Sequence, residues 1–146
     1  MTRQVPAFDL STYLPYRMTV AAEKLSTCLA KRYRTQFGIS IAEWRVLVHL
    51  LHSGEVSVRD LEQRVNLEKS KASRAATRLE TEGYITKDRN TEDRRLIKLA
   101  LTDKGHTLMA ELVPLATAFQ DRLHEVIAEH MAGLDAALDA IIDEDL

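Results

Sequence analysis

The spacing of apolar residues predicts a chain built mostly of helices. Apolar side chains recur at three- and four-residue steps over 14–37 and again over 40–54, which is typical of helices with one buried face. Gly38 follows the first segment and suits the left-handed conformation that ends many helices. Ser40 and Glu43 have the spacing of a capping box, so a second helix is predicted to begin there.

The next segments predict two more helices and a β-hairpin. Ser57 is placed to cap a short helix that ends near Asn66, and a longer helix follows over 68–82. Two helices joined by a tight turn are typical of a helix-turn-helix motif. Residues 84–86 and 96–101 are rich in strand-forming side chains and flank a polar loop, which predicts a hairpin.

The C-terminal third of the chain predicts two further helices. Thr102 is placed to cap a long helix, and Pro114 is expected to bend or interrupt it. Near 132–133 the chain is expected to turn into a last helix with one apolar stripe, made of Leu134, Ala137, Leu138, Ile141 and Ile142. The predicted fold is therefore mostly α, with six helices and a small β-hairpin wing: a winged helix-turn-helix.

The composition is that of a folded globular protein. The chain has 146 residues, of which 45% are hydrophobic and 29% charged, and this fits one domain and excludes disorder. It has a single cysteine, no apolar run long enough to span a membrane, and no apolar leader at its start. These features predict a protein of the reducing cytoplasm without a membrane partner.

The charge is distributed unevenly along the chain. A net charge of −2 does not by itself indicate a nucleic-acid partner. Residues 1–54 carry a net charge of +4 and residues 55–98 carry +2, whereas residues 103–146 carry −8. An acidic C-terminal segment therefore masks basic residues in the first two thirds, and this division predicts different partners for the two parts.

The predicted helix over 68–82 has a small apolar face and a basic, hydroxyl-rich face. Long cations reach phosphates or guanine edges, and short hydroxyls let a helix approach base edges, so this face predicts contact with the major groove of double-stranded DNA. A merely solvated surface is the alternative, and the preceding short helix and turn favour DNA. The candidate major-groove residues are Lys69, Ser70, Lys71, Ser73, Arg74, Thr77 and Arg78.

The loop between the two predicted strands is also basic. Arg89, Arg94 and Arg95 would project from an exposed turn, and a slim cation there suits the negative potential of a minor groove. Asp93 can pair with one of these arginines and fix its direction. The alternative is a hairpin that only adds solubility.

Taken together, these motifs resemble the MarR (multiple antibiotic resistance regulator) family over roughly residues 10–145. The resemblance lies in the order and spacing of Ile41-Ala42-Glu43-Trp44-Arg45-Val46-Leu47, Leu61, Lys69-Ser70-Lys71-Ala72-Ser73-Arg74, Leu79-Glu80, Gly83-Tyr84-Ile85, Asp93-Arg94-Arg95 and Leu101-Thr102-Asp103-Lys104-Gly105. It implies a homodimeric winged-helix transcription regulator, usually a repressor, often released by a small ligand or an oxidant. It also implies a minor-groove contact by Arg95, supported by Asp93. Ala72 and Asn66 depart from the family's pattern, which bears on the operator sequence rather than on the fold.

The apolar stripes of the first helix and the last two are longer than a small winged-helix core can cover, which predicts a homodimer. A two-fold dimer presents two recognition helices about 34–36 Å apart, and this spacing requires a pseudo-palindromic operator. The predicted organisation is an N-terminal dimerisation helix over 1–36, a DNA-binding domain over 37–101, and dimerisation helices over 102–146 that intertwine with those of the partner.

A small-molecule inducer is a further predicted partner, bound between the dimer helices and the DNA-binding domain. Aromatic side chains with one cation suit an aromatic carboxylate. The candidate pocket residues are Tyr13, Tyr16, Arg17, Trp44 and His49. The alternative is that Tyr16 and Trp44 only pack in the core.

Two other sensors are weaker predictions. Apolar neighbours in the helical pattern favour a buried, inert thiol for Cys28, whereas nearby lysines and arginines would favour a reactive one. His49 and His52 are three residues apart on one predicted helix, but the other histidines are scattered. We therefore predict neither a metal site nor a cofactor.

The predicted function is sequence-specific binding of double-stranded DNA by a transcription regulator, a repressor released by a small ligand. Enzymatic activity is not predicted, because the sequence lacks a Gly-rich phosphate loop, a nucleophile elbow and a His-Glu metal motif. Two alternatives stay open: a redox-responsive regulator acting through Cys28, and a winged-helix module that binds protein without touching DNA.

Overall fold

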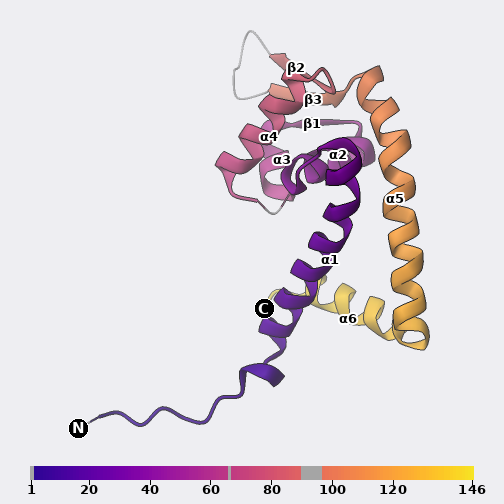
Figure 1. Cartoon of the computed structure of the whole chain (residues 1–146). Helices are drawn as coiled ribbons and strands as arrows, with labels where there is room; N and C mark the ends of the chain where they lie inside the picture. Colours follow the sequence, from indigo (N-terminus) through magenta and orange to yellow (C-terminus); the bar gives the residue numbers. More distant parts are fainter. Residues whose placement is uncertain (1, 66, 90–96) are drawn as a thin grey trace.

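The computed structural model of the chain describes residues 2–65, 67–89 and 97–146. Within these ranges the fold consists of six α-helices and a small antiparallel sheet (Figure 1), as predicted for a winged helix-turn-helix. The helices are α1 (Leu14–Phe37), α2 (Ile41–Ser53), α3 (Val58–Arg64), α4 (Lys69–Thr81), α5 (Asp103–Ile127) and α6 (Met131–Asp143). The strands are β1 (Glu55–Ser57), β2 (Ile85–Arg89) and β3 (Ile97–Leu101).

The predicted helix start and stop signals are confirmed. Helix α1 ends at Gly38, whose φ of 65° is left-handed. Ser40 and Glu43 form the capping box of α2, in which each side chain is 3.1 Å from the other residue's backbone nitrogen. The hydroxyls of Ser57 and Thr102 cap α3 and α5 in the same way, each accepting from a backbone N–H of the first helical turn.

The sheet has one strand more than the predicted hairpin. Strands β2 and β3 form the hairpin, and β1 pairs antiparallel with the other side of β3, so the order is β1-β3-β2. The prediction was incomplete because β1 spans only three residues, too few to show the alternation of a strand. Its last residue, Ser57, is also the N-cap of α3, so strand and helix follow each other directly.

One core joins the winged-helix part to the two long helices. Side chains from α2, α3, α4 and the sheet are fully buried in it, together with Tyr33 of α1 and Met109 of α5. Tyr33 stacks on Trp44, with ring centroids 5.3 Å apart, and burial raises the pKa of its hydroxyl. Trp44 therefore belongs to the packing between α1 and α2.

Beyond this core, α1 and α5 extend away from the sheet as two long arms, and α6 folds back at the far end of α5 (Figure 1). Pro114 does not interrupt α5, which is helical from Asp103 to Ile127. The lost hydrogen bond leaves the carbonyl of Ala110 without its helical donor, and Ala110 is exposed, so water can satisfy it.

The prediction of a turn near 132–133 was wrong. The corner lies at a 3₁₀ turn over Ala128–His130, where Ala128 has a φ of 49°, and Gly133 lies inside α6. The apolar stripe explains this position: Met131, Leu134 and Leu138 face one hollow together, so the helix has to begin before Gly133.

Candidate nucleic-acid interface

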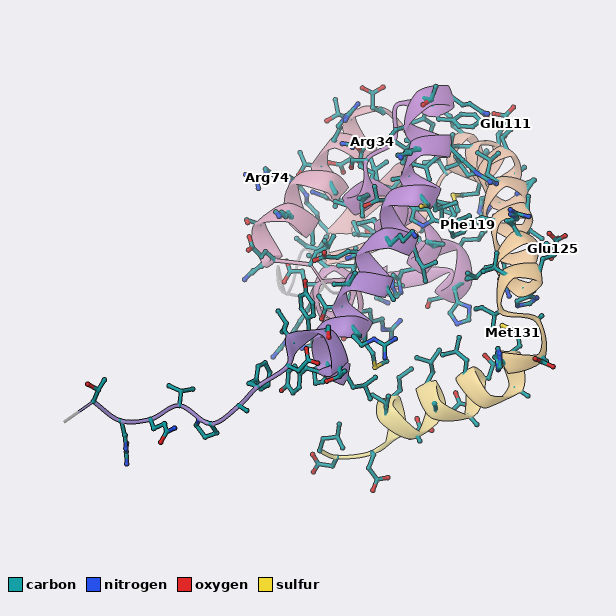
Figure 2. The ribbon with its side chains drawn as sticks, turned by 60° about the horizontal axis from the view of Figure 1, so that its bottom comes forward. Arg34, Arg74, Glu111, Phe119, Glu125 and Met131 are labelled. Carbon is teal, nitrogen blue, oxygen red and sulfur yellow. The ribbon has the colours of Figure 1, made fainter. Side chains whose placement is uncertain are left out.

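Helix α4 has one buried and one exposed face. Ala72, Ala75, Ala76 and Leu79 are buried against the rest of the domain. All seven predicted major-groove residues of this helix are exposed. Figure 2 shows Arg74 pointing outward, on the side of the molecule away from α5. The structure thus brings the predicted cations and hydroxyls together on one surface.

Arg78 has a partner that the sequence pattern did not indicate. Its Nη1 atom lies 3.1 Å from Oε1 of Glu43, which is buried at the start of α2. The same carboxylate oxygen accepts the backbone N–H of Ser40 in the capping box. The i, i+3 spacing of Ser40 and Glu43 predicted the cap, but a contact across 35 positions of sequence leaves no local signal.

The wing strand β2 also contacts α4. The amine of Lys87 donates to the hydroxyl of Thr77 at 3.4 Å, so this predicted DNA contact is already hydrogen-bonded within the domain. Arg89 is exposed at the end of β2. The other predicted wing residues, Asp93, Arg94 and Arg95, lie outside the described residues.

The end of α4 is bonded to the start of α5, at a place we call the α4–α5 junction (residues 82–84 and 102–105). Thr102 donates its hydroxyl to the carbonyl of Gly83 at 2.6 Å, and Lys104 donates its amine to the carbonyl of Glu82, also at 2.6 Å. A Cβ atom on Gly105 would collide with the carbonyl oxygen of Tyr84. The junction therefore holds α4 and the long arm α5 in a fixed relation.

The predicted pocket residues do not gather in one place within this chain. Tyr13, Tyr16 and Arg17 are exposed at the beginning of α1, whereas Trp44 stacks on Tyr33. Twenty helical residues separate Tyr13 from Tyr33, so the two groups lie about 30 Å apart along α1. His49 lies on α2, where partial burial, aided by the positive charge of Arg64, lowers its pKa.

Two of the hollows among the described residues border α1 and contain none of these predicted pocket residues. One, of about 520 Å³, lies between α1 and the start of α2 and is lined by Thr19, Ala22, Glu23, Ser26, Thr27, Ile41 and Arg45. A guanidinium nitrogen of Arg45 lies 3.4 Å from the hydroxyl of Ser26. Arg45 is therefore a cation that lines this hollow. The sequence pattern did not indicate its position, because most of the other lining residues lie on α1 and not on α2.

The larger hollow, of about 810 Å³, is mainly apolar and is bounded by α1, α5 and α6. Cys28, Phe119, Leu123, Leu134 and Leu138 are among its lining residues. Figure 2 shows Phe119 between α1 and α5, and Arg32 lies over its ring at 5.5 Å. Cys28 is only partly buried here, so its thiol stays a redox candidate.

The described residues contain no cluster of three or more His, Cys, Asp or Glu side chains that could hold a metal ion. None of their helices combines the length and apolar character needed to cross a membrane.

Comparisons with known proteins agree with this fold. The sequence pattern of the MarR family matches residues 37–96. The transcriptional repressor MdtR of Bacillus subtilis is 32% identical over 92 residues, which are 63% of this chain and 59% of that protein. The chain spans about half the length of the curated relatives that it matches.

Solved structures match nearly the whole chain. A MarR family transcriptional regulator from Silicibacter pomeroyi DSS-3 is 27% identical and superposes with a TM-score of 0.76, covering 92% of this chain and 99% of that one. NadR in complex with 4-hydroxyphenylacetate shares the fold, with a TM-score of 0.78 at 23% identity over 97% of this chain and 100% of that one. The MarR family pattern and the fold matched here are those of transcription regulators and not of enzymes. Residues 37–96 therefore match the MarR family, and nearly the whole chain has the fold of MarR family transcriptional regulators.

Proposed function

We propose that this protein is a homodimeric repressor that binds a pseudo-palindromic operator through α4 and the wing. The observation that carries the proposal is the exposed face of α4, where Lys69, Lys71 and Arg74 stand among short hydroxyls while the opposite face is buried. Such a helix fits the major groove, with cations at phosphates or guanine edges and serines close to the bases. Arg89 and the predicted wing residues add the minor-groove contact.

The dimer is supported by α6, which has no buried residue although nine of its 13 residues are hydrophobic. Leu134, Ile141 and Ile142 are among its exposed side chains, and its inner face borders the apolar hollow between α1 and α5. Exposed apolar surface of this extent marks a protein partner. A second copy of the chain supplies both the cover for α6 and the second recognition helix that a palindromic operator requires.

The function is tested by gel shift with the DNA upstream of the protein's own gene. We expect a specific complex whose affinity falls by about 10³-fold or more between 50 and 200 mM salt, because a dimer with six to ten phosphate contacts releases that many counterions. A scrambled fragment of equal length is the control. If neither this region nor genomic fragments form a specific complex, the module that binds only protein becomes the better explanation.

A second part of the proposal is release by a small carboxylic acid, bound in the hollow between α1 and α2. The observation that favours it is the position of Arg45 in a hollow that also holds serine and threonine hydroxyls and the carboxylate of Glu23, since a guanidinium is suited to bidentate binding of a carboxylate. The hollow adjoins the start of α2, whose capping carboxylate contacts α4. A bound acid there would contact α1 and the first turns of α2, and α2 in turn contacts α4 through Glu43.

The ligand proposal is tested by thermal unfolding with 4-hydroxyphenylacetate and its uncharged amide. At a hundredfold excess over Kd, the acid is expected to stabilise the protein by about 2.7 kcal/mol, a rise in Tm of roughly 5–10 °C. The amide should have no effect, and Arg45→Met, which keeps the aliphatic stem, should abolish the response to the acid. An equal response to acid and amide, or a response that survives in Arg45→Met, contradicts the assignment of Arg45.

A further inference from the structure

We propose that Glu43 and Arg78 are a positioning pair, which sets the orientation of α4 against α2, and that Arg78 is not a phosphate contact. The inference rests on the proposed DNA binding and deepens it. It assigns Arg78 to holding the orientation of α4 and leaves the other cations of this helix to contact DNA. It thereby replaces the sequence-based prediction for Arg78.

The first step is the burial of Glu43. Its side chain is only 4% exposed, and one oxygen, Oε1, accepts both the backbone N–H of Ser40 and the Nη1 of Arg78, each at 3.1 Å. A buried carboxylate is costly without donors, so both bonds are strongly favoured. The donor on Ser40 is fixed within α2, which leaves Arg78 as the donor that reaches across from α4.

The second step concerns the face of α4 that packs against its neighbours, which is made mostly of alanine. Three of its four buried residues, Ala72, Ala75 and Ala76, carry no long side chain that could interlock with another helix, whereas Leu79 does, so most of this face resists rotation weakly. Arg78 follows Ala75 by one turn on the same side. Its bond to Glu43 fixes the rotation of α4 at a point where the alanine face does not.

The third step is the incomplete packing at this point. A hollow of about 260 Å³ lies between the start of α2 and α4, and it is lined by Ser40, Ala42, Glu43, Lys71, Arg74, Ala75 and Arg78. Apolar contact therefore does not close this part of the interface. The carboxylate–guanidinium bond spans it instead, and its length sets the separation of the two helices.

The fourth step is the contrast with Arg74, one turn earlier on α4. In the described part of the chain no hydrogen bond or ion pair involves the Arg74 side chain, and it points outward (Figure 2). It can reach a phosphate without giving up an internal contact. Arg78 could turn its Nη1 to a phosphate only by giving up the bond to the buried Glu43 carboxylate, which is unfavourable.

The experiment compares Arg78→Gln, Glu43→Gln and the double variant with Arg74→Gln, which removes the same charge from the same helix. Gln can serve in a capping box, so Glu43→Gln keeps the cap of α2 and loses the charge. Kd for the upstream DNA is measured from 50 to 200 mM salt. Each pair variant is expected to raise Kd about tenfold, and the double variant no more than either single one, because interacting residues are not additive.

Two measurements separate a positioning role of Arg78 from a contact with DNA: the salt dependence of Kd, and the direction in which Glu43→Gln changes Kd. The slope of log Kd against log salt should be unchanged in the pair variants and lower by about 1.8 in Arg74→Gln, because each of the two copies loses one phosphate contact. Glu43→Gln removes a negative charge near the DNA, so simple electrostatics predicts tighter binding, whereas positioning predicts weaker binding. A lower slope in Arg78→Gln together with tighter binding by Glu43→Gln would overturn the proposal.

Hydrogen exchange of the free protein keeps the test independent of DNA. The amides of α4 should exchange faster in all three pair variants than in Arg74→Gln, because α4 has lost a link to α2. If the unmodified protein forms no specific DNA complex, the proposed function fails. Amide hydrogen exchange then tests by itself whether Glu43 and Arg78 hold α4 against α2. Equal rates in the pair variants and in Arg74→Gln contradict a positioning role.

Discussion

Replacing Gly105 by alanine is expected to lower the free energy of unfolding by about 3 kcal/mol and Tm by roughly 10 °C. The added Cβ would collide with the carbonyl oxygen of Tyr84 and press on the side chain of Leu101. Neither neighbour can give way easily, because the same carbonyl accepts the backbone N–H of Thr102 and the junction is held by two further bonds. Chemical denaturation followed by circular dichroism measures the change.

Gly133→Ala is the matched control, since Gly133 lies within α6 and nothing lies within 4 Å of the position of its Cβ. Alanine is the better helix former by up to about 1 kcal/mol, so this variant should be slightly stabilised. The same propensity acts in favour of alanine at position 105. A Gly105→Ala protein as stable as the control would therefore show that the α4–α5 junction yields to the added atom.

Glutamate at both Leu134 and Leu138 is expected to convert the proposed dimer into a monomer. Both side chains border the apolar hollow between α1, α5 and α6. Each substitution occurs in both copies, and each buried leucine contributes about 1.5–3 kcal/mol, so the dimer should lose at least about 6 kcal/mol, or more than 10⁴-fold in Kd. Light scattering at micromolar concentration should give the chain mass of 16.5 kDa for the variant and twice that for the unmodified protein.

Glutamate at Ala136 and Ala140 adds the same charge to the opposite side of α6 and should leave the dimer intact. Dissociation by both variants alike would mean that charge, and not the apolar stripe, controls assembly. A single-chain mass for the unmodified protein would contradict the dimer itself.

Features encoded within a few neighbouring residues could be predicted from the sequence. The bounds of α1 follow from apolar periodicity and from Gly38, and the start of α2 follows from the spacing of Ser40 and Glu43. The two faces of α4 could be assigned because alanines and cations alternate with a helical period. Each of these signals reports a local backbone or burial preference, which tertiary contacts here reinforce.

Features that depend on distant contacts could not be predicted. Strand β1 exists because β3 offers an edge to Glu55–Ser57, and Arg78 turns toward Glu43 because packing brings α4 against α2. The corner at Ala128 occurs where no glycine marks it, since the stripe of α6 decides where the helix begins. The aromatic residues assigned to one pocket do not meet, because Tyr13 and Tyr16 lie at the start of α1 whereas Trp44 lies on α2 and stacks on Tyr33 near the end of α1.

The α4–α5 junction makes α5 a lever. Helix α5 has 25 residues and is therefore about 37 Å long, with the end of α4 bonded at one end and the α6 corner at the other. If a partner copy holds the α6 end, a tilt of only about 5° moves the DNA-binding end by about 3 Å, enough to put two recognition helices out of step with successive major grooves. A ligand would then need to supply only a small angular change, and the length of the arm would amplify it.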